Sequence, residues 1–111
     1  MRTVTAHRGR TGAAAVVAAL LMALSVASAA GGVRATNYAF KPATVTIQKD
    51  QSVTWKRVEG SHTVTFRDGS FDKRLNKSHP KRTRTFHKAG TFRYYCRPHE
   101  DLGMKGKVVV E

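Results

Sequence analysis

Three side chains that could bind a soft metal ion lie within nine residues near the end of the chain. Cys96 offers a thiolate, His99 an imidazole and Met104 a thioether. Thiolate and thioether sulfur favour Cu(I), and imidazole suits copper in both of its common oxidation states. This segment therefore predicts a copper site, which needs at least one more ligand from elsewhere in the chain.

His62 is the candidate for that ligand because it shares a burial pattern with Cys96. Apolar and other residues alternate over 62–66 and over 91–96, which predicts two strands with His62 and Cys96 on their inward faces. A buried imidazole and a buried thiol are costly without a partner, and a shared metal would supply one. Two histidines, one cysteine and a weak axial methionine are the ligands of blue-copper electron-transfer sites.

The other two histidines of the region after residue 30 are not expected to bind this copper. His79 precedes Pro80 in a basic segment, and His87 lies near the turn at 89–90. We expect both imidazoles to be exposed to solvent.

Short strands are the elements that must position the ligands. Apolar and polar residues alternate over 44–48 and 52–56, and again over 107–110, with no convincing helical period after residue 30. Trp55 shares a face with Val53 and is expected in the core. The pattern predicts an all-β fold, an antiparallel Greek-key β-sandwich of about seven or eight strands.

The first 29 residues are predicted to be a secretory signal peptide. Three arginines precede an almost wholly apolar segment at 13–27, and small residues at 27–29 suit cleavage after Ala29. An uncleaved membrane anchor is the alternative, although the segment is short and alanine-rich for a spanning helix. We therefore expect an exported protein, periplasmic or otherwise extracytoplasmic or secreted.

Residues 30–111 are expected to form one small copper-binding domain, and we expect a monomer. A domain of this size has one modest core, and small exported domains often rely on disulfides for stability. The chain has a single cysteine, which cannot form an internal disulfide. A bound metal is the natural substitute.

The chain is strongly basic, with 20 lysines and arginines against seven acidic residues and a formal charge of +13. Without the three arginines of the predicted signal, the charge is +10, which would steer anionic partners toward the protein. The densest run, Lys73 to Arg84, is either a solvated basic surface or a docking patch for an acidic redox partner or for anionic envelope polymers or lipids. Nucleic acid is not expected, because the protein should be exported and has no recognisable nucleic-acid module.

Three stretches of the sequence resemble the cupredoxins, the plastocyanin- and amicyanin-like small blue-copper proteins. They are YAFKPATVTIQKDQSVTW, SHTVTFRDGSFD and AGTFRYYCRPHEDLGMKGKVVV. The resemblance implies that His62, Cys96 and His99 form a trigonal plane around one copper ion and that Met104 provides the long axial bond. It also implies that His99, flanked by Pro98 and Leu102, is the electron port; Tyr95 could offer a second route.

A one-electron carrier between extracytoplasmic redox partners is the function that the resemblance implies. A protein that stores or delivers copper without redox turnover is the alternative, although dedicated Cu(I) carriers more often have several Met or Cys ligands. An enzyme is not expected, because the chain has no His-x-His pair and no length for further copper centres. In one respect the chain departs from the family: many relatives have an asparagine after the first histidine that bonds to the loop after the cysteine, and here the two places hold Thr63 and Arg97.

Overall fold

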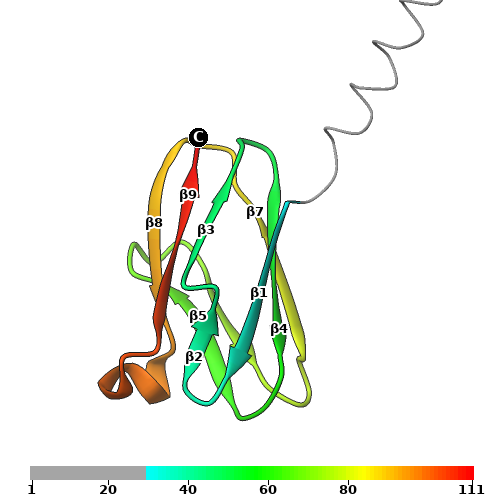
Figure 1. Cartoon of the computed structure of the whole chain (residues 1–111), viewed down its shortest axis with the longest axis vertical. Coiled ribbons are helices and arrows are strands. Elements are labelled where there is room, and N and C mark those ends of the chain that lie inside the picture. Colours follow the sequence, from blue (N-terminus) through cyan, green and yellow to red (C-terminus); the bar gives the residue numbers. More distant parts are fainter. Residues whose placement is uncertain (1–29) are drawn as a thin grey trace, which may run out of the picture.

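The computed structural model describes residues 30–111 (Figure 1), so the predicted signal peptide at 1–29 lies outside the described residues. The described chain forms nine strands and one short 3-10 helix, η1. In chain order they are β1 (Gly31–Thr36), β2 (Ala39–Lys41), β3 (Thr44–Ile47), β4 (Ser52–Arg57), β5 (His62–Phe66), β6 (Asp72–Leu75), β7 (Lys81–Thr85), β8 (Gly90–Tyr95), η1 (Arg97–Leu102) and β9 (Lys105–Val110).

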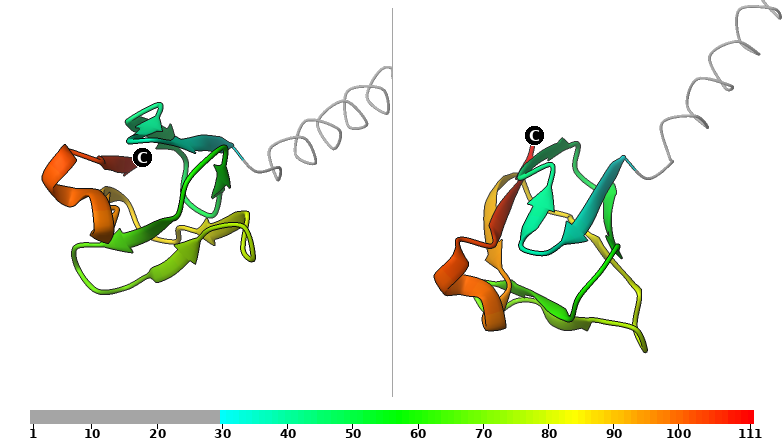
Figure 2. Two further views of the ribbon diagram at one scale, coloured as in Figure 1. Left: turned by 90° about the horizontal axis from the view of Figure 1, so that it is seen from below. Right: turned by 60° about the horizontal axis from the view of Figure 1, so that its bottom comes forward.

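The strands form two sheets, which confirms the predicted β-sandwich. One sheet has the order β2-β1-β4-β7 and the other β3-β9-β8-β5-β6, and Figure 2 shows the layers from the end at which η1 lies. The number of strands is nine, and two of the pairings are parallel: β1 with β4 and β3 with β9. Alternation in a sequence tells which face of a strand is buried but not the direction of its neighbour, so the pattern could not reveal the parallel pairs.

The core lies between the sheets and is centred on aromatic rings. Trp55 is fully buried, as expected, and packs edge-on against Tyr94 and Phe66 at centroid distances of 5.4 and 5.9 Å. Edge-to-face contacts of this kind stabilise beyond the burial of the rings. The core therefore depends on strands from both sheets, since Trp55 belongs to β4 and the other two rings to β8 and β5.

The basic run Lys73 to Arg84 contains two strands that the sequence pattern did not identify. Strand β6 is an edge of one sheet and β7 is an edge of the other. Most side chains of both strands are exposed, so neither has the apolar alternation that marks a half-buried strand. No helix within residues 30–111 has the length and apolar character needed to cross a membrane.

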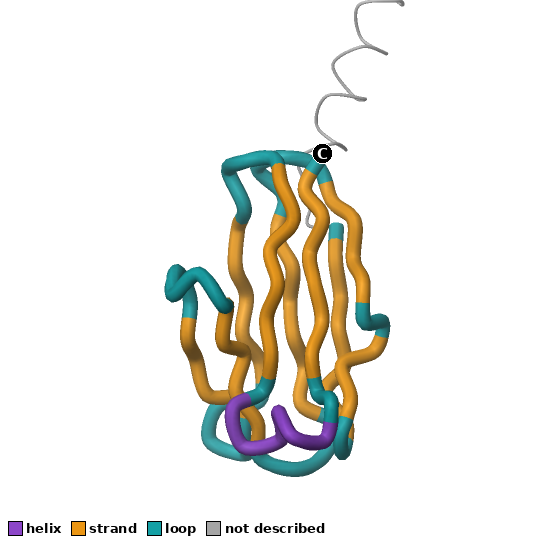
Figure 3. Tube along the Cα trace, turned by 90° about the vertical axis from the view of Figure 1, so that its left-hand side faces the viewer, coloured by secondary structure: helices purple, strands orange, loops and turns teal. Residues whose placement is uncertain are grey.

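One end of the sandwich gathers all four predicted metal ligands. Strand β5 begins at His62, β8 ends just before Cys96, η1 contains His99, and β9 begins just after Met104. Figure 3 shows η1 lying across this end of the strands. The fold thus brings residues 62 and 96–104 together, although more than 30 residues separate them in sequence.

Candidate metal centre

Three of the predicted ligands place their donor atoms around a common point. The Nδ1 atoms of His62 and His99 are 3.2 Å apart. The Cys96 Sγ atom lies 3.3 Å from Nδ1 of His99 and 3.7 Å from Nδ1 of His62. His62 and Cys96 are buried and His99 is partly exposed. Such a cluster of one thiol and two imidazoles is a metal-binding geometry.

Met104 lies beside this cluster and is completely buried. Its carbonyl oxygen accepts a hydrogen bond from the backbone N–H of Cys96 (3.0 Å), and its own N–H donates to the carbonyl of His99 (3.3 Å). Main-chain hydrogen bonds therefore tie the three predicted ligands of the loop to one another. These main-chain bonds do not require a bound metal, so the backbone itself sets the shape of the loop.

The ring of His62 is oriented by a backbone carbonyl. Its Nε2 lies 2.7 Å from the oxygen of Glu59, and because a carbonyl can only accept, Nε2 carries the proton. Nδ1 is then unprotonated and presents its lone pair to the cluster, which is the state a metal ligand needs. The donor set and this tautomer both suit copper.

The turn before His62 depends on Gly60, a residue that the sequence analysis did not single out. Gly60 has a φ of +81°, and a Cβ atom there would overlap the side chain of Asn37 and approach the His62 ring. Arg57 Nε donates to the Gly60 carbonyl (2.6 Å), which holds the turn from the strand side. The residues between β4 and β5 therefore form the turn that presents the Glu59 carbonyl to His62.

Burial shifts the pKa values of both buried ligands, His62 and Cys96. Burial lowers the pKa of His62, helped by repulsion from His99 and Arg57 and opposed by the hydrogen bond to the Glu59 carbonyl, so the neutral, metal-binding imidazole is favoured. Burial raises the pKa of the Cys96 thiol. A metal must therefore displace the thiol proton when it binds.

Thr63 forms a hydrogen bond across to the loop that follows Cys96. The hydroxyl oxygen of Thr63 accepts a hydrogen bond from the backbone N–H of Arg97 (2.9 Å). The Thr63 hydroxyl also lies 2.8 Å from that of Thr65, which donates to Asp72 (2.9 Å). The strand that carries His62 is in this way bonded directly to the residue after Cys96.

The Arg97 side chain closes this network from outside. Its guanidinium donates to Asp72 (2.7 Å) and, through Nε, to Thr65 (3.4 Å). Thr65 and Asp72 are not predictable as part of the site, because alternation places Thr65 on the outward face of its strand, yet Thr65 is only 8% exposed. No signal in the sequence indicates that an arginine 32 residues later would cover it.

The remaining histidines lie outside the cluster. His79 and His87 are exposed, and His87 Nδ1 pairs with the Asp50 carboxylate at 2.8 Å. Within residues 30–111, the only cluster of three or more His, Cys, Asp or Glu side chains that could hold a metal is that of His62, Cys96 and His99.

Comparison with known proteins agrees with this geometry. Residues 27–111 match the family model described as copper binding proteins, plastocyanin/azurin family. The chain belongs to this family. Over 84 residues this cupredoxin is 38% identical to the chloroplastic plastocyanin of Tetradesmus obliquus, covering 65% of this chain and 58% of that protein's length. It is 32% identical to the plastocyanin of Scenedesmus fuscus, covering 65% of this chain and 86% of that one.

Solved structures with the same fold include plastocyanin and amicyanin. Oxidised plastocyanin from Dryopteris crassirhizoma superimposes with a TM-score of 0.65 and 24% identity, over 73% of this chain and all of that one. The Cu(I) form of an amicyanin mutant superimposes with a TM-score of 0.66 and 29% identity, over 77% of this chain and 85% of that one. Family and donor set together identify copper as the cofactor.

Proposed function

We propose that this cupredoxin is a type 1 blue-copper protein that carries single electrons, with His62, Cys96 and His99 as the equatorial ligands and Met104 as the axial ligand. The observation that carries the proposal is the convergence of the three donor atoms, each 3.2 to 3.7 Å from the others. Copper supplies the redox chemistry by changing between Cu(II) and Cu(I) in this mixed sulfur and nitrogen environment.

The protein's part is to hold its ligands in one arrangement for both oxidation states. His62 is fixed by the Glu59 carbonyl, and the peptide after Cys96 is fixed by Thr63. Cys96 and Met104 have no exposed surface, which keeps water from the sulfur ligands. A site that is fixed before electron transfer has little to rearrange during it.

His99 is the route by which we propose electrons enter and leave. It is the only partly exposed member of the ligand cluster. The exposed ring of Tyr38 packs against it at 4.6 Å between centroids, and Leu102 on the same loop is 60% exposed. A small apolar surface around an exposed ligand edge suits transient contact with a redox protein.

The proposed setting is outside the cytoplasm, with the protein acting as a monomer between protein redox partners. The charge of +10 that remains after the predicted signal supports a partner with an acidic docking surface, and also permits association with anionic envelope polymers or lipids. The name of the Tetradesmus obliquus relative places that protein in the chloroplast. The experiment on partners is cross-linking in native envelope fractions at low and high salt, because screening should abolish charge-driven docking.

The test of the copper chemistry is to add Cu(II) to the purified protein and record the visible spectrum through repeated reduction and reoxidation. We expect an intense blue band that cycles with the redox state and is absent from Cys96→Ser. His79→Gln is the matched control, because His79 is exposed and outside the cluster. A pale complex, or copper that leaves on reduction, would instead favour storage or delivery of copper.

A further inference from the structure

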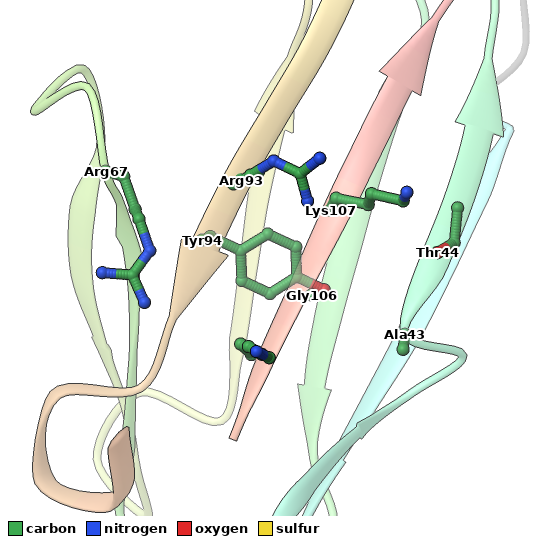
Figure 4. Close-up of a pocket in the computed structure, with 8 residues that line it drawn as sticks. Ala43, Thr44, Arg67, Arg93, Tyr94, Gly106 and Lys107 are labelled. Carbon is green, nitrogen blue, oxygen red and sulfur yellow. The ribbon is translucent and has the colours of Figure 1, made fainter. Parts of the chain in front are cut away.

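A pocket of about 280 Å3 lies on the outer face of the sheet that contains β3, β9 and β8 (Figure 4). It is separate from the copper ligands, none of which lines it. Four of its lining side chains are cationic, and they come from three places in the chain: Arg67, Arg93, Lys105 and Lys107.

The positive charge at this pocket is largely uncompensated. Arg67 pairs with Glu100 at 3.0 Å. Within residues 30–111, no carboxylate forms an ion pair with Arg93, Lys105 or Lys107. Three cationic groups therefore share one hollow without a protein counterion.

The register of the sheet makes this arrangement costly. Arg93 of β8 lies directly opposite Lys107 of β9 in an antiparallel pair. Like charges at directly opposite positions destabilise a sheet, whereas opposite charges there stabilise it. An anion bound between Arg93 and Lys107 would attract both side chains and offset the repulsion between them.

The rest of the lining is compatible with a small polar ligand. Thr44 adds an exposed residue with a hydroxyl group. Gly106 leaves room for the Tyr94 ring, since a Cβ atom at residue 106 would lie 2.5 Å from the Tyr94 hydroxyl. That hydroxyl is buried on the core side of the sheet, where the Tyr94 ring packs against Trp55. Gly106 and Tyr94 therefore close the floor of the pocket, and the polar groups available to a ligand are those of the outer face.

We propose that this pocket is a binding site for a small multivalent oxyanion of the phosphate or sulfate class. The guanidinium group of Arg93 presents paired donors that match two oxygens of such an anion, and Lys105 and Lys107 add charge and single donors. The volume is large enough to hold such an anion together with part of its water shell. The proposal does not depend on the redox chemistry of the copper site.

The test is a titration of the isotope-labelled, copper(I)-loaded protein, followed by backbone amide chemical shifts. Inorganic phosphate and sulfate are compared with acetate and chloride at constant ionic strength. We expect saturable shifts that centre on residues 93 and 105–107 with phosphate and sulfate, and no saturation with acetate or chloride. Shifts that are the same for all four anions, or that spread evenly over every basic surface, would show that only diffuse charge acts and would overturn the proposal.

Matched variants separate the pocket from the net charge. Arg93→Gln/Lys107→Gln removes two charges from the pocket, and Lys49→Gln/Lys73→Gln removes two from exposed positions elsewhere. Because two charge-assisted hydrogen bonds are lost, we expect phosphate to bind at least about tenfold more weakly to the first variant. Binding to the second should stay within about twofold of the unmodified protein, because net charge acts weakly under constant screening. Equal affinities of the two variants would contradict the site.

Thermal unfolding gives a second readout that needs no assigned spectrum. Without phosphate, Arg93→Gln/Lys107→Gln should melt at a higher temperature than the unmodified protein, because the opposed charges are gone. With phosphate, the melting temperature should rise more for the unmodified protein and the control variant than for the pocket variant, since a ligand stabilises the state that binds it and the general salt effect is the same for all three. If phosphate raises the melting temperature of the pocket variant as much as that of the control variant, the proposal is wrong.

Discussion

The hydroxyl oxygen of Thr63 accepts a hydrogen bond of 2.9 Å from the backbone N–H of Arg97. Each of these residues directly follows a proposed copper ligand, His62 and Cys96. The bond therefore joins two segments of the site that lie 34 residues apart in the sequence. Together with the pairing of β5 with β8 and the contacts of Arg97 with Thr65 and Asp72, this bond holds the ligand of β5 against the ligand loop.

Replacing Thr63 by alanine should loosen this junction. Thr63→Ala leaves the Arg97 N–H without its acceptor, at an expected cost of about 1 to 2 kcal/mol in the free energy of unfolding. The reduction potential and the blue band should shift as well, because the ligand loop is no longer fixed. Thr63→Ser keeps the hydroxyl and should stay close to the unmodified protein in voltammetry and thermal unfolding. Equal behaviour of the alanine and serine variants would show that the hydroxyl does not position the loop.

Gly60 offers a sharper test of how His62 is oriented. Gly60→Ala and Gly69→Ala both put a side chain on a backbone with φ near +80°, so both should lose about 1 to 2 kcal/mol of stability. Only at residue 60 does the added Cβ meet Asn37 and the His62 ring; at residue 69 it meets nothing. Copper affinity, measured by competition with a chelator, should therefore fall in Gly60→Ala alone. Equal affinities would mean that the turn does not control His62.

The sequence predicted the burial of His62 and Cys96 better than it predicted what orients these side chains. Alternation with a period of two placed His62 and Cys96 inward, and both are buried. The Glu59 carbonyl could not be predicted as the partner of His62, because that contact depends on the left-handed backbone at Gly60. Alternation also places Thr65 on the outward face of β5, and a period of two cannot indicate that Arg97 covers that face.

Alternation in the sequence predicted the β-sandwich but did not identify every strand in it. The strands with one buried face, such as β3 and β4, follow the alternation closely. Strands β6 and β7 are charged because they are edges, and charge at an edge is a feature of tertiary arrangement rather than of local pattern. The basic run Lys73 to Arg84 therefore also supplies one edge strand of each sheet, and its charges disfavour pairing of these edges with another chain.

The edge charges should prevent aggregation rather than stabilise the fold. Lys73→Thr/Lys81→Thr places β-forming neutral residues on the two edge strands, where unpaired backbone groups can template another chain. We expect light scattering to rise faster on heating, with a change of less than about 0.5 kcal/mol in the free energy of unfolding. Lys49→Thr/Lys56→Thr removes the same charge away from the edges, since Lys56 lies on the central strand β4 and Lys49 in a turn. If the control aggregates as readily, net charge rather than edge protection is responsible.

Arg84 should stabilise the core even though it adds to the positive charge. Its guanidinium carbon lies 4.4 Å from the ring centroid of Phe66 and 4.5 Å from that of Phe86. Removal of this contact and of the packed aliphatic stem in Arg84→Ala should cost about 2 kcal/mol in urea unfolding. Arg84→Met keeps the packing and should recover part of the loss, whereas Lys81→Ala, at an exposed position of β7, should change little. A more stable Arg84→Ala would show that charge repulsion outweighs the aromatic contacts.

Tyr94 should make the protein sensitive to alkaline pH. Burial raises the pKa of Tyr94 to about 12, from an ordinary value of 10.0, because the phenolate is disfavoured in the core. Below pH 10 the hydroxyl is protonated in both the folded and the unfolded chain, and its contribution is fully present. Between pH 10 and pH 12 the unfolded chain releases this proton more readily than the folded chain does, so stability falls by an amount on the order of 2 to 3 kcal/mol.

Tyr94→Phe removes the titrating group and isolates this effect from the lysines that deprotonate over the same range. The free energy of unfolding, measured in denaturant at pH 9, 10 and 11 with both proteins in the same copper state, should fall more steeply for the unmodified protein than for the variant. At pH 9 the hydroxyl is protonated in both the folded and the unfolded chain, so the stability of the variant should lie within about 1.5 kcal/mol of that of the unmodified protein. Parallel pH dependences would mean that the Tyr94 hydroxyl is already solvated in the folded protein.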